Sequence, residues 1–339
     1  MKTHLQKLVN NQSLSQEEMK LVAQQLFLDE ITDSEIAAFL IALKSKGETV
    51  DEITGLIETL LEQALPFPKH IKGVMDNCGT GGDGSSSFNV STTSAFVIAG
   101  AGIKVAKHGN RSVSSKTGSA DVLEALGINL YLPQEVMEEL LHDIGIAFLF
   151  APHVHPRLGR IMKVRKALKL PTIFNLIGPL TNPIALDYQL VGIYERNQVE
   201  TLAAVLMKLG RKRAVVVNGA GYMDEASLQG ENIISLLENG SIHTFALTPE
   251  EVGLQTHSNQ SIVGGDAEEN ARILRDVLKG NTGVHRDTVL LNAGLGIYAA
   301  AGAATVQEGI ALAKESIDSG RAYETMQRLV EKSMKEAIL

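Results

Sequence analysis

The sequence has little of what extracellular and membrane-spanning proteins rely on. A single cysteine, Cys78, excludes an internal disulfide framework and a cysteine-based zinc site. No stretch reaches about 18 uninterrupted apolar residues, and the opening segment MKTHLQKLVNNQ lacks the apolar core of a signal peptide. The motif G-x-x-x-x-G-K-[ST] is also missing, which argues against a P-loop nucleotide hydrolase. We therefore expect a cytoplasmic protein that has no membrane partner.

Positive charge is also scarce. Lys and Arg total 31 residues against 39 Asp and Glu, so the formal net charge is −8. Such a surface opposes non-specific binding to nucleic acid, and no nucleic-acid partner is expected. The 339 residues, 44% hydrophobic and 21% charged, are ordinary for a globular protein. They suffice for one large domain with a smaller companion, or for two domains of ordinary size.

One segment lacks acidic residues altogether and is rich in glycine, hydroxyl groups and cations. It contains no Asp or Glu from Gly84 to Ala120, and its cationic residues are Lys104, Lys107, His108, Arg111 and Lys116. Just before it, glycines stand at positions 79, 81, 82 and 84, between the apolar residues 74–78 and 94–101. Strand, glycine turn and helix in that order direct backbone N–H groups at a phosphate. We interpret residues 76–94 as a phosphate cradle.

Two other interpretations of the glycine turn are weaker. A glycine- and serine-rich segment is often an exposed linker, but the apolar run that follows is too dense for one. The letters from Gly79 to Gly84 also fit the dinucleotide pattern G-x-G-x-x-G. That fingerprint needs an acid about 20 residues further on, whereas the next apolar run ends in Lys107 and His108. A phosphate or diphosphate suits these residues better than a ribose diol.

The first 70 residues differ in pattern from the rest. Three capping boxes, Ser15 with Glu18, Thr32 with Glu35 and Thr49 with Glu52, each open a segment with helical periodicity. We therefore predict a helical domain over residues 1–70, joined by helices from 166–187. Over residues 71–339, strand-like runs alternate with amphipathic helices, which predicts an α/β domain with a mostly parallel sheet flanked by helices.

A pair of adjacent carboxylates forms a second candidate site. Asp224 and Glu225 follow the turn 218–221 at the end of a predicted strand, where carboxylates suit Mg²⁺ that is shared with substrate phosphates. Without the phosphate cradle, the pair would be interpreted as two acids on a solvated loop. With the cradle in the same chain, a Mg²⁺ site is the favoured interpretation. His153 and His155 have a spacing found in zinc sites but lack an evident third ligand nearby, so we interpret this segment as a loop and helix entry near the acceptor pocket.

Several blocks of the sequence together resemble anthranilate phosphoribosyltransferase. They are GTGGD at 79–83, NVST at 89–92, KHGNRSVSS at 107–115, GSADVLEALG at 118–127, FNLIGPLTNP at 174–183, DE at 224–225 and GGDAEENA at 264–271. The resemblance runs from about residue 5 to the C-terminal region. It implies the architecture shared by nucleoside phosphorylases and phosphoribosyltransferases.

The resemblance also implies a reaction. The phosphoribosyl group of 5-phosphoribosyl 1-diphosphate (PRPP) is transferred to the amine of anthranilate in tryptophan biosynthesis, giving N-(5-phosphoribosyl)anthranilate and diphosphate. On the matching positions, PRPP would contact Gly79, Gly82, Asp83, Ser87, Asn89, Val90, Ser91, Thr92, Lys107, His108, Gly109, Asn110, Arg111, Ser112, Val113, Ser114, Ser115 and Ser119. Anthranilate would contact Gly79, His108, Asn110, Arg165 and Gly178. No dedicated acid or base is expected, because an aromatic amine is already neutral at pH 7.

The family pattern further implies two Mg²⁺ ions per monomer, one bound by Ser91 and the other by Asp224 and Glu225. It also implies a homodimer formed through the helical domain. Two alternatives remain at this stage: a pyrimidine nucleoside phosphorylase, and a non-catalytic relative that binds nucleic acid. The blocks at 107–115 and 224–225 favour PRPP over the first, and the net charge disfavours the second.

Overall fold

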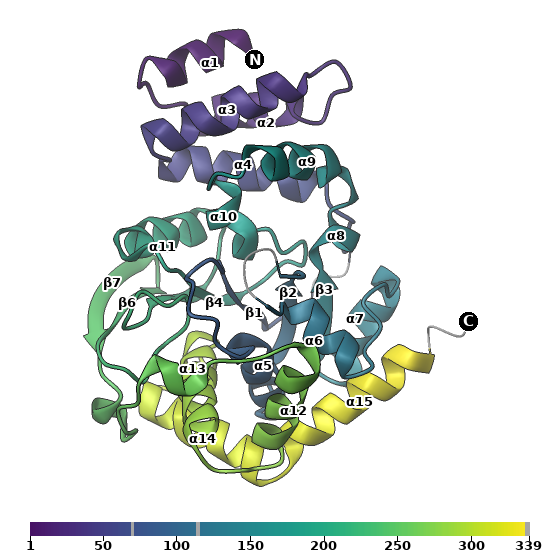
Figure 1. Ribbon diagram of the computed structural model, residues 1–339, viewed down its shortest axis with the longest axis vertical. Coiled ribbons are helices and arrows are strands. Elements are labelled where there is room, and N and C mark those ends of the chain that lie inside the picture. Colours follow the sequence, from purple (N-terminus) through teal and green to yellow (C-terminus); the bar gives the residue numbers. More distant parts are fainter. Residues whose placement is uncertain (69–70, 113–115, 336–339) are drawn as a thin grey trace.

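The computed structural model describes residues 1–68, 71–112 and 116–335. Its N-terminal part is a group of helices that lies above one end of the sheet in Figure 1. They are α1 (Lys2–Val9), α2 (Gln16–Gln25), α3 (Asp33–Lys46) and α4 (Val50–Glu62). Each predicted capping box is confirmed at the start of α2, α3 and α4, where the Ser or Thr side chain accepts from the N3 backbone and the N3 glutamate accepts from the cap.

A seven-stranded sheet forms the centre of the larger part, in the order β3-β2-β1-β4-β5-β6-β7. The strands are β1 (Val74–Gly79), β2 (Lys104–Gly109), β3 (Ile146–Phe150), β4 (Tyr188–Gly192), β5 (Arg213–Asn218), β6 (Asn232–Glu238) and β7 (Ser241–Leu247). The first five are parallel to one another, while β6 and β7 are antiparallel to their neighbours. The parallel strands therefore end at one common edge, where β1, β4 and β5 lie side by side.

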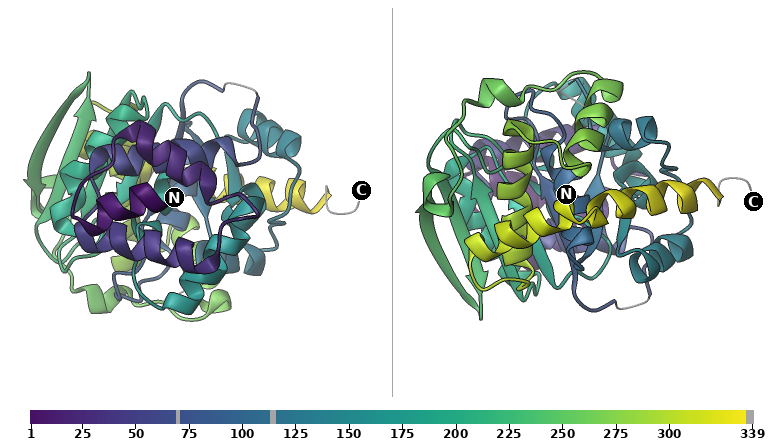
Figure 2. Two further views of the ribbon diagram at one scale, coloured as in Figure 1. Left: turned by 90° about the horizontal axis from the view of Figure 1, so that it is seen from above. Right: turned by 90° about the horizontal axis from the view of Figure 1, so that it is seen from below.

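Helices cover both faces of the sheet, as Figures 1 and 2 show. The helices that follow β1 are α5 (Val90–Gly100), α6 (Ser119–Ala125), α7 (Gln134–Asp143), α8 (Ala151–Val154), α9 (Gly159–Leu168), α10 (Phe174–Ile177), α11 (Val199–Lys208), α12 (Ala267–Leu278), α13 (Val284–Ala299), α14 (Val306–Asp318) and α15 (Arg321–Lys335). Figure 2 shows α15 crossing the end of the molecule opposite the N-terminal helices.

Two hydrophobic cores result, one on each face of the sheet. Alternate residues of β5 divide between them: Val215 and Val217 belong to the core that contains α5 and α13, and Ala214 and Val216 belong to the core that contains α11. Continuous burial of this kind is what a parallel sheet with covered faces requires. The predicted fold class is confirmed.

The second core extends into the N-terminal helices without a break. It includes Leu40 and Ile57 of those helices, Ile161 of α9, Ile177 of α10 and Leu202 of α11. The domain boundary near residue 70 and the assignment of 166–187 to the helical domain stay predictions. Among the described residues, no helix is both long and apolar enough to cross a membrane.

Candidate active site

The glycine turn connects the end of β1 to the start of α5, as predicted. Gly81, Gly82 and Gly84 have φ angles of 69°, 81° and 71°, which L-residues with side chains rarely adopt. Asn77 Nδ2 of β1 donates to the carbonyl oxygen of Ser91 in the first turn of α5 at 2.8 Å, which fixes the helix over the strand. The turn therefore presents its backbone between a strand end and a helix N-terminus.

The acidic pair lies on top of the neighbouring strand ends. Gly79 of β1 pairs with Gly192 of β4, and both lack the side chain that would exclude the loop carrying Asp224. A Cβ on Gly79 would lie 2.3 Å from Asp224 Oδ2, and a Cβ on Gly192 only 1.6 Å from the Asp224 carbonyl oxygen. Gly79 is thus needed for close approach and not for a left-handed backbone.

Direct hydrogen bonds join the acidic pair to the glycine turn. The backbone N–H of Gly81 donates to Asp224 Oδ2 at 2.6 Å, and that of Ser91 donates to Glu225 Oε1 at 3.2 Å. These partners are 143 and 134 residues apart in the chain. The structure therefore brings the two candidate sites of the sequence into one.

Burial makes this site electrostatically unusual. It raises the pKa of Asp224 and that of Glu225, and the neighbouring carboxylates raise them further: Asp83 acts on Asp224, and Asp224 acts on Glu225. Asp83 Oδ2 is also buried and has no hydrogen-bond partner among the described residues.

Buried carboxylates that repel one another stay ionised only beside a cation, so the donor set fits Mg²⁺. Within the described residues no three His, Cys, Asp or Glu side chains form a complete metal cage. An ion here would complete its shell with water and substrate oxygens.

Lys107 is buried beneath the cradle, whereas the composition of its segment suggests a cation that faces the ligand. Lys107 of β2 is only 3% exposed, and its Nζ donates to the carbonyl oxygen of Asn77 at 2.9 Å. Its positive charge lowers the pKa of Glu225, against the larger effect of burial. Lys107 thus acts from beneath the site in this structure, and its contact with PRPP stays a prediction.

Residues 109–119 lie at the end of β2 and before α6. The guanidinium of Arg111 pairs with Asp121 at 3.0 Å and also with Glu124, and it lies over the Phe150 ring at 5.5 Å. Ser119 Oγ donates to the carbonyl oxygen of Asn110 at 3.2 Å. Val113, Ser114 and Ser115 lie outside the described residues. The PRPP contacts of this segment, with Gly109 and Ser112, stay predictions.

The residues predicted to bind anthranilate fall into two groups, one around His108 and one around Arg165. His108 Nδ1 donates to the carbonyl oxygen of Gly178 at 3.2 Å, and burial lowers the pKa of His108 to about 3, so its ring is neutral. Arg165 of α9 donates to Asn175 Oδ1 at 3.2 Å and lies 5.2 Å above the Phe174 ring. Its Nε is buried without a partner among the described residues, and burial lowers the pKa of its guanidinium. Its printed side-chain partners in the described part of the chain are Met162 Sδ and Asn175 Oδ1, neither of which carries a negative charge.

The loop that carries Gly178 is held from below by buried side chains. Asn182 Nδ2 donates to Asp76 Oδ2 at 3.0 Å, and the backbone N–H of His108 donates to Asp76 Oδ1 at 3.1 Å. His155 Nε2 donates to the carbonyl oxygen of Thr181 at 2.7 Å, while His153 Nε2 donates to that of Leu132 at 3.0 Å. His155 thereby ties the residue that follows α8 to the loop that carries Gly178.

Other predicted residues complete the cradle wall. Ser87 forms an antiparallel bridge with Val263, Val90 and Thr92 are buried in α5, and Asn89 precedes that helix. Sequence reasoning missed Gly192, whose role depends on a loop distant in the chain, and Asn270, which contacts Asn89. The block GGDAEENA contained the signal for Asn270, but its sequence alone gave it no role.

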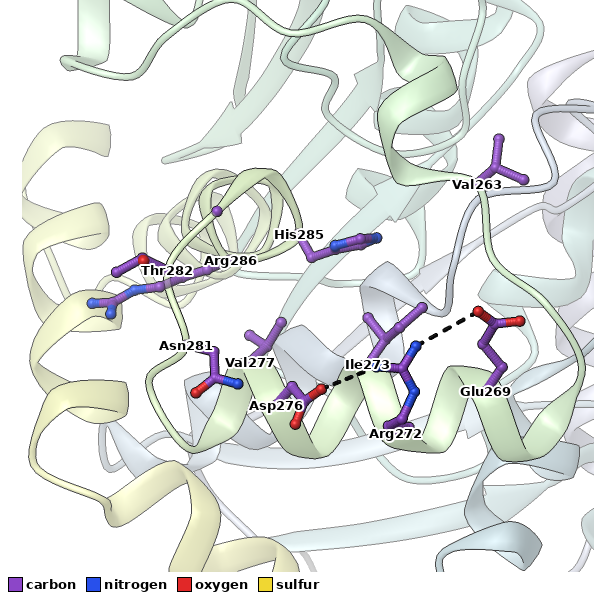
Figure 3. A pocket seen from close by; sticks show the side chains of 11 residues that line it. Val263, Glu269, Arg272, Ile273, Asp276, Val277, Asn281, Thr282, His285 and Arg286 are labelled. Carbon is purple, nitrogen blue, oxygen red and sulfur yellow. Dashed lines mark hydrogen bonds and ion pairs between the residues drawn. The ribbon is translucent and has the colours of Figure 1, made fainter.

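A separate cavity of about 310 Å³ lies between α12 and α13, as Figure 3 shows. It is lined by Val263, Glu269, Arg272, Ile273, Asp276, Val277, Asn281, Thr282, Gly283, His285 and Arg286. None of these is a predicted site residue. Its charges are largely paired, because Arg272 contacts Glu269 and Asp276, and Arg286 contacts Asp318.

Two family models match the chain. The glycosyl transferase family helical bundle domain matches residues 2–64, and the a/b domain of the glycosyl transferase family matches residues 71–323. Among curated proteins, anthranilate phosphoribosyltransferase of Bacillus mycoides (strain KBAB4) is 57% identical over 330 residues, which cover 97% of each chain. That of Bacillus anthracis (strain A0248) is 56% identical over 336 residues, covering 99% of this chain and 98% of the relative.

Solved structures give the same result. Anthranilate phosphoribosyltransferase from Thermus thermophilus has a TM-score of 0.92 and 40% identity, covering 97% of this chain and 99% of its own. The Saccharomyces cerevisiae enzyme in complex with PRPP and Mg has a TM-score of 0.89 and 27% identity, covering 98% and 97%. The protein described here belongs to the anthranilate phosphoribosyltransferase family.

Proposed function

We propose that this protein transfers the phosphoribosyl group of PRPP to the amine of anthranilate, with the diphosphate bound over the glycine turn. The observation that carries the proposal is the pair of hydrogen bonds from Gly81 and Ser91 to Asp224 and Glu225. They support the proposal because they bring the glycine turn and the two carboxylates together at one strand edge. The related S. cerevisiae structures are complexes with PRPP and Mg and with 4-fluoroanthranilate, which supports the same ligands here.

Charge explains how the site favours loss of diphosphate. Apart from the Gly81 and Ser91 N–H groups, which donate to Asp224 and Glu225, the glycine turn and the first turn of α5 supply backbone N–H groups for the anion. Preorganised donors of this kind stabilise charge as it develops. Asp83, Asp224 and Glu225 alone would repel diphosphate. Bound Mg²⁺ supplies the compensating charge. We assign it to Asp224 and Glu225, with a second ion at Ser91, giving two per monomer.

Anthranilate is held by contacts that suit its carboxylate and ring. The Arg165 guanidinium has only the neutral partners Met162 Sδ and Asn175 Oδ1 among the described residues, and its planar fork matches a carboxylate. Neutral His108 and the Gly178 loop form the adjoining wall. The amine is a nucleophile without deprotonation, so orientation supplies the catalytic effect.

The chain is further proposed to act in the cytoplasm as a homodimer joined through α1–α4 and α9. Support for the interface comes from large apolar side chains exposed there, Val9, Leu21, Leu28 and Met162. Light scattering after size exclusion tests the assembly, because a monomer at micromolar concentration contradicts it.

The reaction is tested by mixing the protein with PRPP, Mg²⁺ and anthranilate and recording the loss of anthranilate fluorescence. Turnover that needs all three components supports the proposal, and its absence overturns it. Thymidine with inorganic phosphate is the matched control, since a pyrimidine nucleoside phosphorylase would cleave the nucleoside instead.

A further inference from the structure

The block GGDAEENA lies against the outer side of the phosphate cradle. The backbone N–H of Phe88 donates to the carbonyl oxygen of Ile262 at 2.9 Å, and that of Gly264 donates to the carbonyl oxygen of Ser86 at 2.9 Å. Ser87 and Val263 form the antiparallel bridge between them. Residues 262–264 therefore act as a short strand that holds residues 86–88.

Asn270 of α12 ties this contact to the start of α5. It is 2% exposed, its Oδ1 accepts the backbone N–H of Gly265 at 2.8 Å, and its Nδ2 donates to Asn89 Oδ1 at 2.8 Å. The Asp266 side chain caps α12 by accepting from the Glu269 N–H at 2.9 Å, which fixes the turn that carries Asn270. One buried amide thus connects the glycines of this block to a predicted PRPP-binding residue.

Asn89 is at the N-cap position of α5, but its side chain bonds to Asn270 and does not cap the helix. Asn is a preferred N-cap, yet in the described structure the Asn89 side chain makes no hydrogen bond to α5. Its Oδ1 is used by Asn270, and its Nδ2 points to the carbonyl oxygen of Thr117 at 3.4 Å. Thr117 Oγ1 in turn donates to the carbonyl oxygen of Gly265 at 2.9 Å. The amides close a loop of contacts around the cradle.

The Val263 side chain adds little packing to this segment. Val263 is 41% exposed and lines the cavity of about 310 Å³ that Figure 3 shows, across from Ile273 and His285. Side chains there leave open space where a packed core would resist movement. Ile262 and Phe88 anchor the two segments in the core, and the hydrogen bonds of Gly264, Gly265 and Asn89 fix their position beyond those anchors.

We propose that Asn270 is a positioning residue for PRPP binding, acting through Asn89 and the backbone of residues 86–89. This inference rests on the proposed function of the same site. Asn270 touches no substrate in it. Its amide sets the orientation of Asn89 and holds the start of α5 next to Gly265.

The test measures the KM for each substrate in Asn270→Ala and Asn270→Asp. Both variants lose the amide N–H group that donates to Asn89. Asp keeps an oxygen that can accept from the Gly265 N–H, so this variant should keep the fold even if the Ala variant does not. We expect the KM for PRPP to rise about tenfold, the effect of one buried hydrogen bond, and the KM for anthranilate to change less than about twofold. Ser333→Ala, which removes a buried hydroxyl from α15, is the matched control with unchanged kinetics.

A double-mutant cycle separates positioning from a general loss of stability. If Asn270 acts through Asn89, then Asn270→Ala adds less than about twofold to the KM for PRPP in an Asn89→Ala background. Effects that multiply, or an equal rise in both KM values, overturn the inference while wild-type turnover stands. Absence of wild-type turnover overturns the proposed function itself.

Discussion

Gly79→Ala tests whether close approach between β1 and the acidic loop creates the active site. The added Cβ would lie 2.3 Å from Asp224 Oδ2 and 2.8 Å from its carbonyl oxygen, whereas an ordinary carbon–oxygen contact needs more than about 3 Å. The carboxylate must therefore move by about 1 Å, away from the Gly81 N–H that it accepts at 2.6 Å. A displacement of that size costs on the order of a hundredfold in rate. We expect kcat/KM for PRPP to fall by about that factor and the Mg²⁺ requirement to rise.

Gly159→Ala is the matched control for that variant. Gly159 begins α9 with a φ of −51°, and a Cβ there meets no described atom within 4 Å. Alanine also has the higher helix propensity, so this change should leave kinetics and thermal stability intact. The assay is the initial rate of anthranilate fluorescence loss across a Mg²⁺ titration, with thermal unfolding measured in parallel. A Gly79→Ala protein with wild-type rates and wild-type Mg²⁺ dependence would refute the reasoning.

Further predictions concern the acceptor residues and the acidic pair. Arg165→Lys should raise the KM for anthranilate about tenfold, because Lys lacks the planar fork, and should raise the KM for PRPP less. Equal rises of the two KM values in steady-state kinetics would contradict the role of Arg165. Asn182→Ala should raise mainly the KM for anthranilate, since it frees the Gly178 loop from Asp76, and an unchanged value contradicts this. Asp224→Asn with Glu225→Gln should abolish turnover or shift its Mg²⁺ dependence. Burial raises the pKa of both carboxyls above their unfolded values, so the folded state binds more protons, and stability measured in EDTA should fall as the pH rises from mildly acidic towards alkaline. In the double variant this slope should become shallower.

The parts of the fold that follow from local chemistry were predictable. The capping boxes at Ser15, Thr32 and Thr49 mark helix starts because each satisfies orphan backbone donors within four residues. The meeting of the glycine turn with Asp224 was also predictable, since carboxyl ends of parallel strands share one edge.

Other features depend on contacts that composition cannot reveal. Lys107 lies on a strand that is covered on both faces, so its charge is buried although its neighbours in sequence suggest an open anion site. The antiparallel pair β6 and β7 was not predicted, yet its turn is Asn239–Gly240, and both residues have positive φ. That dipeptide between apolar runs is a strong hairpin signal, and it was available in the sequence.

The unbroken apolar core that joins α3, α4, α9, α10 and α11 to one face of the sheet has a mechanical consequence. A swing of α1–α4 as a rigid body would separate α3 from α9 and α4 from α11 and would expose the apolar side chains buried between them, at about 25 cal/mol for each Å² uncovered. Any movement of these helices therefore has to carry α9 and α11 with them or break those contacts. A chain cut near residue 70 would leave the apolar sides of α9 and α11 exposed to water.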